Sequence, residues 1–273
     1  MKTVKENGQL AVVAKRQLAK LGTDQKNNIL AVCAKALRDN AEFIVGENAK
    51  DMENAKNNNM PQGLQDRLML NVERVNAMAE GLELIEKLPD PIGEVLDMRT
   101  LPNGLTVGQK RVPMGVIGII YEARPNVTSD AFGLCLKAGS AVILRGGSDA
   151  IHSNIATVSV FRKAIEGLGY NPDFVQLVED TTRASSTEMM TLNDYIDLLI
   201  PRGGKGLIQS VVKNATVPVI ETGVGNCHIY MDESGKIDDG VNIIVNAKAQ
   251  RVGVCNAAET LLVHKNIAKE YLP

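Results

Sequence analysis

The cysteines are the strongest candidate nucleophiles in this chain, and their spacing narrows what they can do. Cys33, Cys135, Cys227 and Cys255 lie far apart and form no Cys-x-x-Cys pair. The sequence therefore predicts neither a disulfide framework nor a metal site. Cys33 and Cys135 fall on apolar helical faces, and Cys227 precedes an apolar run. We expect these thiols to be structural, as small apolar side chains are.

Cys255 has the setting of a reactive thiol. Gly253 frees the backbone before it, Arg251 adds positive charge nearby, and small residues flank the sulfur. Positive charge and solvent access favour the thiolate, which is the nucleophilic form of cysteine. A buried and inert Cys255 fits this setting equally well, because free cysteine is among the most buried residue types. The sequence makes Cys255 the candidate for covalent catalysis and leaves its exposure open.

Two Arg-Gly-Gly turns are candidate phosphate sites. Arg145-Gly146-Gly147-Ser148 and Arg202-Gly203-Gly204 each stand between an apolar run and a helical segment. Glycine lets a ligand approach the backbone, a helix N-terminus offers unpaired N–H groups, and the arginine fork matches phosphate oxygens. One such turn can serve merely to connect a strand to a helix, whereas two in one sheet favour a dinucleotide. Ordinary Rossmann and P-loop enzymes are disfavoured, because the chain has neither fingerprint.

Alternating strands and helices must position these turns. Short apolar runs are separated by stretches of helical periodicity, which predicts right-handed crossovers and a parallel sheet. Ligands bind beyond the carboxyl ends of such strands, so the chemistry is expected there. The predicted strands are Gly115–Tyr121, Ala141–Leu144, Phe174–Val178 and Ile196–Ile200, with Val217–Ile220 also extended.

The first ninety residues read as helices and are followed by a hairpin. Apolar stripes at helical spacing cover Leu10–Leu21, Leu30–Ile44 and Leu68–Ile85. An Asn103-Gly104 turn then joins two extended runs, which predicts a hairpin near 97–112. Such a hairpin is a plausible oligomerisation arm.

Composition points to a small-molecule ligand. The chain is 44% hydrophobic, only 3% aromatic and has a net charge of -2. Few rings and no basic run disfavour a nucleic-acid partner, and no apolar run is long enough to span a membrane. The polar start lacks the apolar core of a signal peptide. We expect a soluble, cytoplasmic protein without a nucleic-acid or membrane partner.

The order of several segments resembles the gamma-glutamyl phosphate reductase family, within the aldehyde dehydrogenase superfamily. The combination is highly specific, although each segment alone is not, and it extends over essentially the whole chain. The matching segments are Lys110–Thr128, Val142–Ser148, Ile200–Gly204, Cys227–Asp232, Asn246–Lys248 and Cys255–His264.

This resemblance implies a reaction and roles for residues. The reaction is the reduction of L-glutamyl 5-phosphate by NADPH to L-glutamate 5-semialdehyde, with release of phosphate, in proline biosynthesis. By position, Cys255 matches the nucleophile and Asn126 the side chain of the oxyanion hole. The segment Arg145-Gly146-Gly147-Ser148 matches the turn at the adenosine half of the cofactor, and Gly203-Gly204 the turn near the pyrophosphate and nicotinamide. The full-length protein is expected to be a homo-oligomer.

The predicted fold is α/β, with N-terminal helices and a doubly wound parallel-sheet NADP-binding domain of aldehyde dehydrogenase type over residues 1–225. Residues 226–273 are expected to begin a second, α/β catalytic domain. Family members continue well past the cysteine, so we expect an N-terminal portion of the enzyme.

Glu221 matches a superfamily base only in part and receives no role, because reduction of an acyl phosphate needs no activated water. The alternatives are a non-catalytic nucleotide-binding fragment and a CoA-acylating aldehyde dehydrogenase.

Overall fold

The chain forms two compact units in the computed structural model, which describes residues 2–221, 223, 225–250, 252 and 254–272. The units are Met1–Thr222 and Gly223–Pro273. The division falls just before the boundary at residue 225 that the sequence predicts. Which ligand each unit binds stays a prediction.

A parallel sheet forms the centre of the first unit, as predicted. Its strands β3 (Val116–Tyr121), β4 (Ala141–Arg145), β5 (Val175–Leu177) and β6 (Leu198–Arg202) lie in the order β5-β4-β3-β6. Every residue of β3 and β4 is buried, which explains why these strands are uniformly apolar rather than alternating. The extended run near 217–220 contributes a single parallel bridge between Leu199 and Val219.

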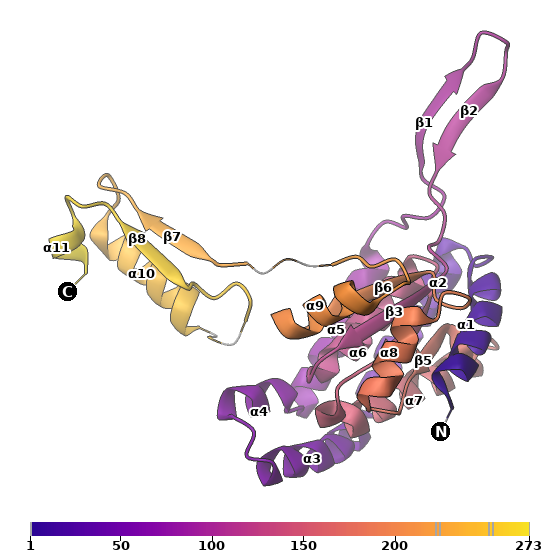
Figure 1. The fold of residues 1–273 in the computed structure, drawn as a ribbon, viewed down its shortest axis with the longest axis horizontal. Coiled ribbons are helices and arrows are strands. Elements are labelled where there is room, and N and C mark those ends of the chain that lie inside the picture. Colours follow the sequence, from indigo (N-terminus) through magenta and orange to yellow (C-terminus); the bar gives the residue numbers. More distant parts are fainter. Residues whose placement is uncertain (1, 222, 224, 251, 253, 273) are drawn as a thin grey trace. The chain divides into compact units, whose positions relative to one another are not determined.

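Helices cover both faces of this sheet (Figure 1). α6 (Pro125–Lys137) and α7 (Ile151–Gly167) pack together on one face. α1 (Val4–Leu18), α8 (Arg183–Thr191) and α9 (Lys205–Asn214) cover the other. The two sets of helices enclose the apolar core.

The N-terminal helices differ in detail from the predicted stripes. The stripe Leu30–Ile44 is divided between α2 (Thr23–Asp39) and α3 (Ala41–Asn57), and α4 (Gln62–Leu68) precedes α5 (Val72–Lys87). The break falls at Asn40, whose side-chain amide donates to the carbonyl of Ala36. A break of one residue preserves the apolar periodicity, so the stripe alone does not reveal it. α2, α3 and α5 pack on the outer side of α6 and α7.

The hairpin that the sequence predicts near 97–112 is present as β1 (Val95–Thr100) and β2 (Thr106–Lys110). The two strands pair antiparallel, and all of their residues are exposed. Apolar side chains are among them, including Leu96, Met98 and Val107.

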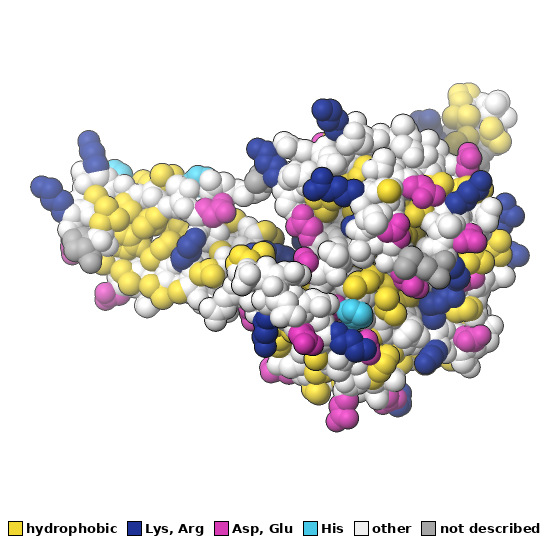
Figure 2. Space-filling view, turned by 60° about the horizontal axis from the view of Figure 1, so that its bottom comes forward, with side chains coloured by type: hydrophobic (Ala, Val, Ile, Leu, Met, Phe, Trp, Pro, Cys, Tyr) yellow, Lys and Arg dark blue, Asp and Glu magenta, His cyan; other side chains and the backbone are white. Residues whose placement is uncertain are grey.

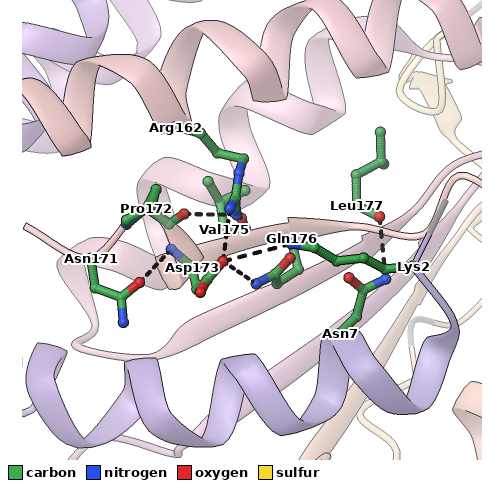
Figure 3. Close-up of polar contacts among 9 residues, drawn as sticks. All are labelled: Lys2, Asn7, Arg162, Asn171, Pro172, Asp173, Val175, Gln176 and Leu177. Carbon is green, nitrogen blue, oxygen red and sulfur yellow. Dashed lines mark hydrogen bonds and ion pairs between the residues drawn. The ribbon is translucent and has the colours of Figure 1, made fainter.

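Side chains cover the outer edge of β5 (Figure 3). Arg162 Nη1 donates to the carbonyls of Val175 and Pro172 at 2.8 and 3.0 Å, and Nη2 contacts the Asp173 carboxylate at 2.7 Å. Asn7 donates to the carbonyl of Leu177 at 3.3 Å. These donors satisfy carbonyls that an edge strand would otherwise leave unpaired.

The second unit is built around one βαβ crossover. β7 (His228–Met231) and β8 (Thr260–Val263) pair in parallel, and α10 (Ile237–Ala249) connects them; α11 (Ala268–Tyr271) follows. The side chains of Val241 and Val245 on α10 are exposed. Figure 2 shows apolar side chains gathered on this unit, which is the smaller one.

We predict that Arg162→Leu destabilises the first unit by about 2–3 kcal/mol, because it removes charged hydrogen bonds to two carbonyls and to Asp173. Chemical denaturation of the purified protein measures this loss. Lys163→Leu is the matched control, since Lys163 is an exposed neighbour on α7 with no ion pair among the described contacts. Equal stability losses in both variants would contradict the role assigned to Arg162.

Candidate active site

The strand order reverses at β3, and this reversal creates the candidate site. The chain leaves β3 for α6 on one face and leaves β6 for α9 on the other. Neighbouring strands whose connections diverge in this way leave a crevice at their carboxyl ends. The predicted segments Glu122–Asn126, Arg145–Ser148 and Arg202–Gly204 all follow strands at this end of the sheet. A Cβ on Gly147 would lie 3.8 Å from the Glu122 backbone, so these two turns are neighbours.

Glu122 bridges the crevice. Its Oε2 accepts a hydrogen bond from the Gly204 amide at 3.0 Å, and its own amide donates to the carbonyl of Arg202 at 3.3 Å. A Cβ on Gly203 would approach the Glu122 carboxyl carbon to 2.7 Å, so a larger residue there would push the Glu122 side chain aside. The carboxylate thus occupies the N-terminus of α9, where the helix dipole favours a negative charge. The analysis of the sequence missed Glu122, although an acidic residue directly after a buried strand was a usable signal.

Arg145 lies inward instead of presenting its fork to solvent. The residue is 9% exposed, and its Nη2 donates to the carbonyls of Thr181 and Thr182 at 2.5 and 2.8 Å. Burial lowers the pKa of the guanidinium, while the charge of Asp180 opposes this effect. Arg145 therefore fixes the turn that leads into α8, and this differs from the exposed phosphate fork that its residue type suggests.

The first turn of α7 is also occupied. The Asp51 carboxylate of α3 accepts from the His152 amide at 3.1 Å, from the Ser153 amide at 2.8 Å and from the Ser153 hydroxyl at 2.5 Å. Burial raises the pKa of Asp51, and these hydrogen bonds oppose the rise. The amides of His152 and Ser153, which the sequence suggested would be free to bind a phosphate, therefore already bond the Asp51 carboxylate. Ser148 itself is exposed.

Asn126 is exposed in the first turn of α6, which begins at Pro125. Proline is suited to the first position of a helix, because its missing N–H would be unpaired there anyway. The Asn126 Nδ2 donates to Asp130 Oδ2 at 3.1 Å. An amide nitrogen carries two hydrogens, so the second remains available for a ligand oxygen. Burial raises the pKa of Asp130, and the hydrogen bond from Asn126 opposes the rise.

The second unit exposes the thiol of Cys255 as a free cysteine. Exposure resolves the open question in favour of an accessible sulfur. The Cys255 carbonyl accepts from Cys227 Sγ at 3.4 Å, and Lys248 Nζ donates to the carbonyl of Ala258 at 2.8 Å. These contacts hold Cys255 and Ala258, which lie between α10 and β8 in the chain. Arg251 and Gly253, the expected neighbours of Cys255, fall outside the described residues.

Cys33 and Cys135 are buried, in agreement with their apolar helical faces. Burial raises the pKa of both thiols, that of Cys135 to about 12. These two cysteines are therefore inert at neutral pH, and Cys255 is the exposed cysteine among those with described placement.

Three further findings concern what the chain can bind. Within the described part of the chain, no cluster of His, Cys, Asp or Glu is arranged to hold a metal ion. No helix in that part is long and apolar enough to cross a membrane.

A cavity of about 560 Å³ lies beside the edge of β5, and none of the predicted site residues lines it. We place the candidate site at the strand ends, because the strand order predicts a crevice there and the predicted residues follow these strands.

The sequence profile of the "Aldehyde dehydrogenase family" matches residues 1–273. The chain belongs to this family, and the parallel sheet and its covering helices agree with that assignment.

Among named relatives, the gamma-glutamyl phosphate reductase of Lachnospira eligens is 55% identical over 273 residues, covering 100% of this chain and 66% of that protein. The protein of the same name from Caldicellulosiruptor saccharolyticus is 56% identical over 260 residues, covering 95% of this chain and 62% of that protein. The chain thus spans less than two thirds of the length of these relatives.

Solved structures share the fold. The crystal structure of gamma-glutamyl phosphate reductase from Thermotoga maritima matches with a TM-score of 0.90 at 45% identity, over 100% of this chain and 66% of that chain. A propionaldehyde dehydrogenase from Clostridium phytofermentans matches with a TM-score of 0.76 at 20% identity, over 100% of this chain and 59% of that chain. The second likeness concerns the fold alone.

We predict that iodoacetamide at neutral pH modifies Cys255 in the folded protein while Cys33 and Cys135 react only after denaturation, because burial suppresses both access and thiolate formation. Mass spectrometry of proteolytic peptides measures the labelling of each cysteine. Cys255→Ser is the control that removes the fast-reacting site. Labelling of Cys33 or Cys135 as fast as Cys255 would show that the thiols do not differ in this way.

Proposed function

We propose that the protein containing this chain reduces L-glutamyl 5-phosphate to L-glutamate 5-semialdehyde and releases phosphate, with NADPH as the reductant. This is the second step of proline biosynthesis from glutamate. The observation that carries the proposal is the 55% identity to a gamma-glutamyl phosphate reductase over 100% of the chain. The exposed thiol of Cys255 supports it.

Cys255 supplies the nucleophile in this mechanism. Its thiolate attacks the acyl carbon of the glutamyl phosphate, the carbon–oxygen bond to phosphate breaks, and a thioester to Cys255 remains. Two easier steps replace one difficult displacement. Sulfur donates electrons poorly to a carbonyl, so the thioester is a good hydride acceptor.

Asn126 is assigned to the oxyanion. Negative charge develops on the carbonyl oxygen in both the acyl-transfer and the reduction step, and a preorganised amide donor stabilises it. The hydrogen bond from Asn126 Nδ2 to Asp130 uses one of the two N–H groups of the amide. The second N–H remains available for the substrate carbonyl oxygen. Loss of one such donor typically lowers the rate by about 10²- to 10³-fold.

The family implies a nicotinamide cofactor, and we place it at the strand ends beside the N-terminus of α9. The Glu122 carboxylate holds the Gly204 amide there, and a pyrophosphate would displace this carboxylate to bind the same amide. Arg202 and Lys205 are exposed on either side of Gly203 and Gly204. NADPH, when bound, would supply the hydride to the thioester carbon, and breaking of the carbon–sulfur bond would then release the aldehyde and the Cys255 thiolate. Because Arg145 is turned inward, we expect Arg202 and Lys205 to supply the positive charge for the NADPH phosphates.

We further propose a cytoplasmic homo-oligomer whose partners are small molecules, without nucleic acid or membrane. The hairpin β1–β2 supports the oligomer, since Leu96, Met98 and Val107 expose apolar surface on a ribbon with no other strand beside it among the described residues. A two-stranded ribbon of this kind is marginally stable alone.

One prediction of this mechanism concerns the covalent intermediate. Incubation with glutamyl phosphate, or with a stable acyl phosphate, in the absence of NADPH adds the acyl group to Cys255, detected by intact and peptide mass spectrometry. Cys255→Ala abolishes the adduct and the reductase activity, whereas NADPH still binds, because the cofactor site lies in the other unit.

Cys33→Ala is the matched control and keeps the adduct, because Cys33 is buried and lies in the first unit. Parallel incubations with a CoA thioester distinguish a CoA-acylating enzyme, and nucleotide binding without any adduct identifies a non-catalytic binding module. An adduct on another cysteine, or an active Cys255→Ala protein, would contradict the assignment of Cys255.

Another prediction of this mechanism concerns Glu122. Its carboxylate competes with the cofactor pyrophosphate for the Gly204 amide and repels it, so Glu122→Gln should tighten NADPH binding by about 2- to 5-fold. Titration of nucleotide fluorescence measures the dissociation constant at low and high salt. Glu166→Gln on α7 is the control and leaves the affinity unchanged. Weaker binding by Glu122→Gln would show that this carboxylate helps to hold the cofactor instead of opposing it.

A further inference from the structure

Three buried polar side chains connect the segments that form the candidate site. Tyr121 ends β3, Thr128 lies in the first turns of α6, and Asn154 lies in the first turn of α7. All three are fully buried. The Tyr121 hydroxyl is 2.7 Å from Thr128 Oγ1, and Thr128 Oγ1 is 2.7 Å from Asn154 Oδ1.

The hydrogen bonds that link these three side chains run in one direction. Thr128 has a single hydroxyl hydrogen, and it donates that hydrogen to Asn154 Oδ1. The contact between Tyr121 and Thr128 therefore has the tyrosine as donor. Burial raises the pKa of the Tyr121 hydroxyl and keeps it protonated for this role. The order of donation is Tyr121 to Thr128 to Asn154.

The far end of this series of side chains lies against the turn at Gly146. With Oδ1 directed at Thr128, the Asn154 Nδ2 is directed at Gly146: a Cβ on Gly146 would lie 2.3 Å from it and 3.3 Å from the Tyr121 hydroxyl. Only glycine allows the turn to pack this closely. The Nδ2 has no hydrogen-bond partner among the described residues.

Stability alone does not explain three buried polar groups at this place. Phenylalanine, valine and leucine would fill similar volumes without the desolvation of a phenol, a hydroxyl and an amide. Hydrogen bonds add a directional constraint to the apolar packing of a helix and so help to fix its rotation about its axis. Thr128 is two residues from Asn126, so it lies on nearly the opposite side of α6. Holding Thr128 inward therefore holds Asn126 outward.

We propose that Tyr121, Thr128 and Asn154 are positioning residues for the reaction. They fix the rotation of the first turn of α6 against the end of β3 and the turn at Gly146, so that the Asn126 amide meets the developing oxyanion. This inference rests on the proposed function. All three side chains are fully buried, so we assign them no direct contact with substrate or cofactor.

A double-mutant cycle on kcat tests the proposal in the complete enzyme. Thr128→Val should lower kcat by about 10- to 100-fold, as expected for a misplaced catalytic group, with the dissociation constant for NADPH within about twofold of the parent. In the Asn126→Ala background, the same substitution should lower kcat by less than about twofold, because it acts through a side chain that is already absent.

Tyr121→Phe provides a second, gentler variant that should follow the same pattern if Thr128→Val fails to fold. Thr157→Val is the matched control: Thr157 is fully buried on α7, and its hydroxyl has no partner among the described residues. It should leave kcat unchanged in both backgrounds.

The outcomes separate this inference from the proposed function. Additive losses in the cycle, or a loss caused by Thr157→Val as large as that of Thr128→Val, overturn the positioning role while the reductase assignment stands. A parent enzyme without reductase activity overturns the proposed function, and the inference with it. A non-additive cycle with unchanged NADPH affinity supports both.

Discussion

The arrangement of the candidate site depends on the reversal of strand order at β3. Because β3 lies between β4 and β6, the chain departs from neighbouring strands toward opposite faces of the sheet. Backbone amides and polar side chains from three separate connections then share one end of the sheet. The uniformly apolar strands make this possible, since they can be covered on both faces. The residues that we propose to bind the cofactor, and those that we propose to position Asn126, all lie at this end of the sheet because of the strand order.

Internal carboxylates complete the helix N-termini near this site, and they do so in two different environments. Asp51 is buried and closes the first turn of α7, which makes it part of the framework. Glu122 is exposed and holds a single amide of α9, so a phosphate can replace it at little cost. The difference in burial supports our proposal that the pyrophosphate binds before α9 and not before α7.

The sequence predicted the parts of this structure that depend on local pattern. The apolar runs located β3 and β4, the Asn103-Gly104 turn located the hairpin, and the setting of Cys33 and Cys135 identified buried thiols. The break at Asn40 escaped notice because the apolar stripe continues through it.

Tertiary contacts account for the remaining differences. Arg145 was predicted to bind the cofactor, which stays a prediction, and in this structure its guanidinium donates to the carbonyls of Thr181 and Thr182. Glu122 and Asp130 had no motif to mark them, because the partner of Glu122 is the Gly204 amide at the start of α9 and that of Asp130 lies one helical turn away. Residue type indicates which chemistry a side chain can perform, whereas only the assembled neighbours decide whether that side chain faces a ligand.

A crystal structure of the protein with NADPH tests the central claim most directly, namely that the cofactor binds where the strand order reverses. The account predicts the pyrophosphate beside Gly203 and Gly204, with the Glu122 carboxylate displaced from the Gly204 amide. A cofactor bound in the cavity beside β5, or a Glu122 carboxylate that stays on Gly204 while the pyrophosphate binds elsewhere, would contradict it.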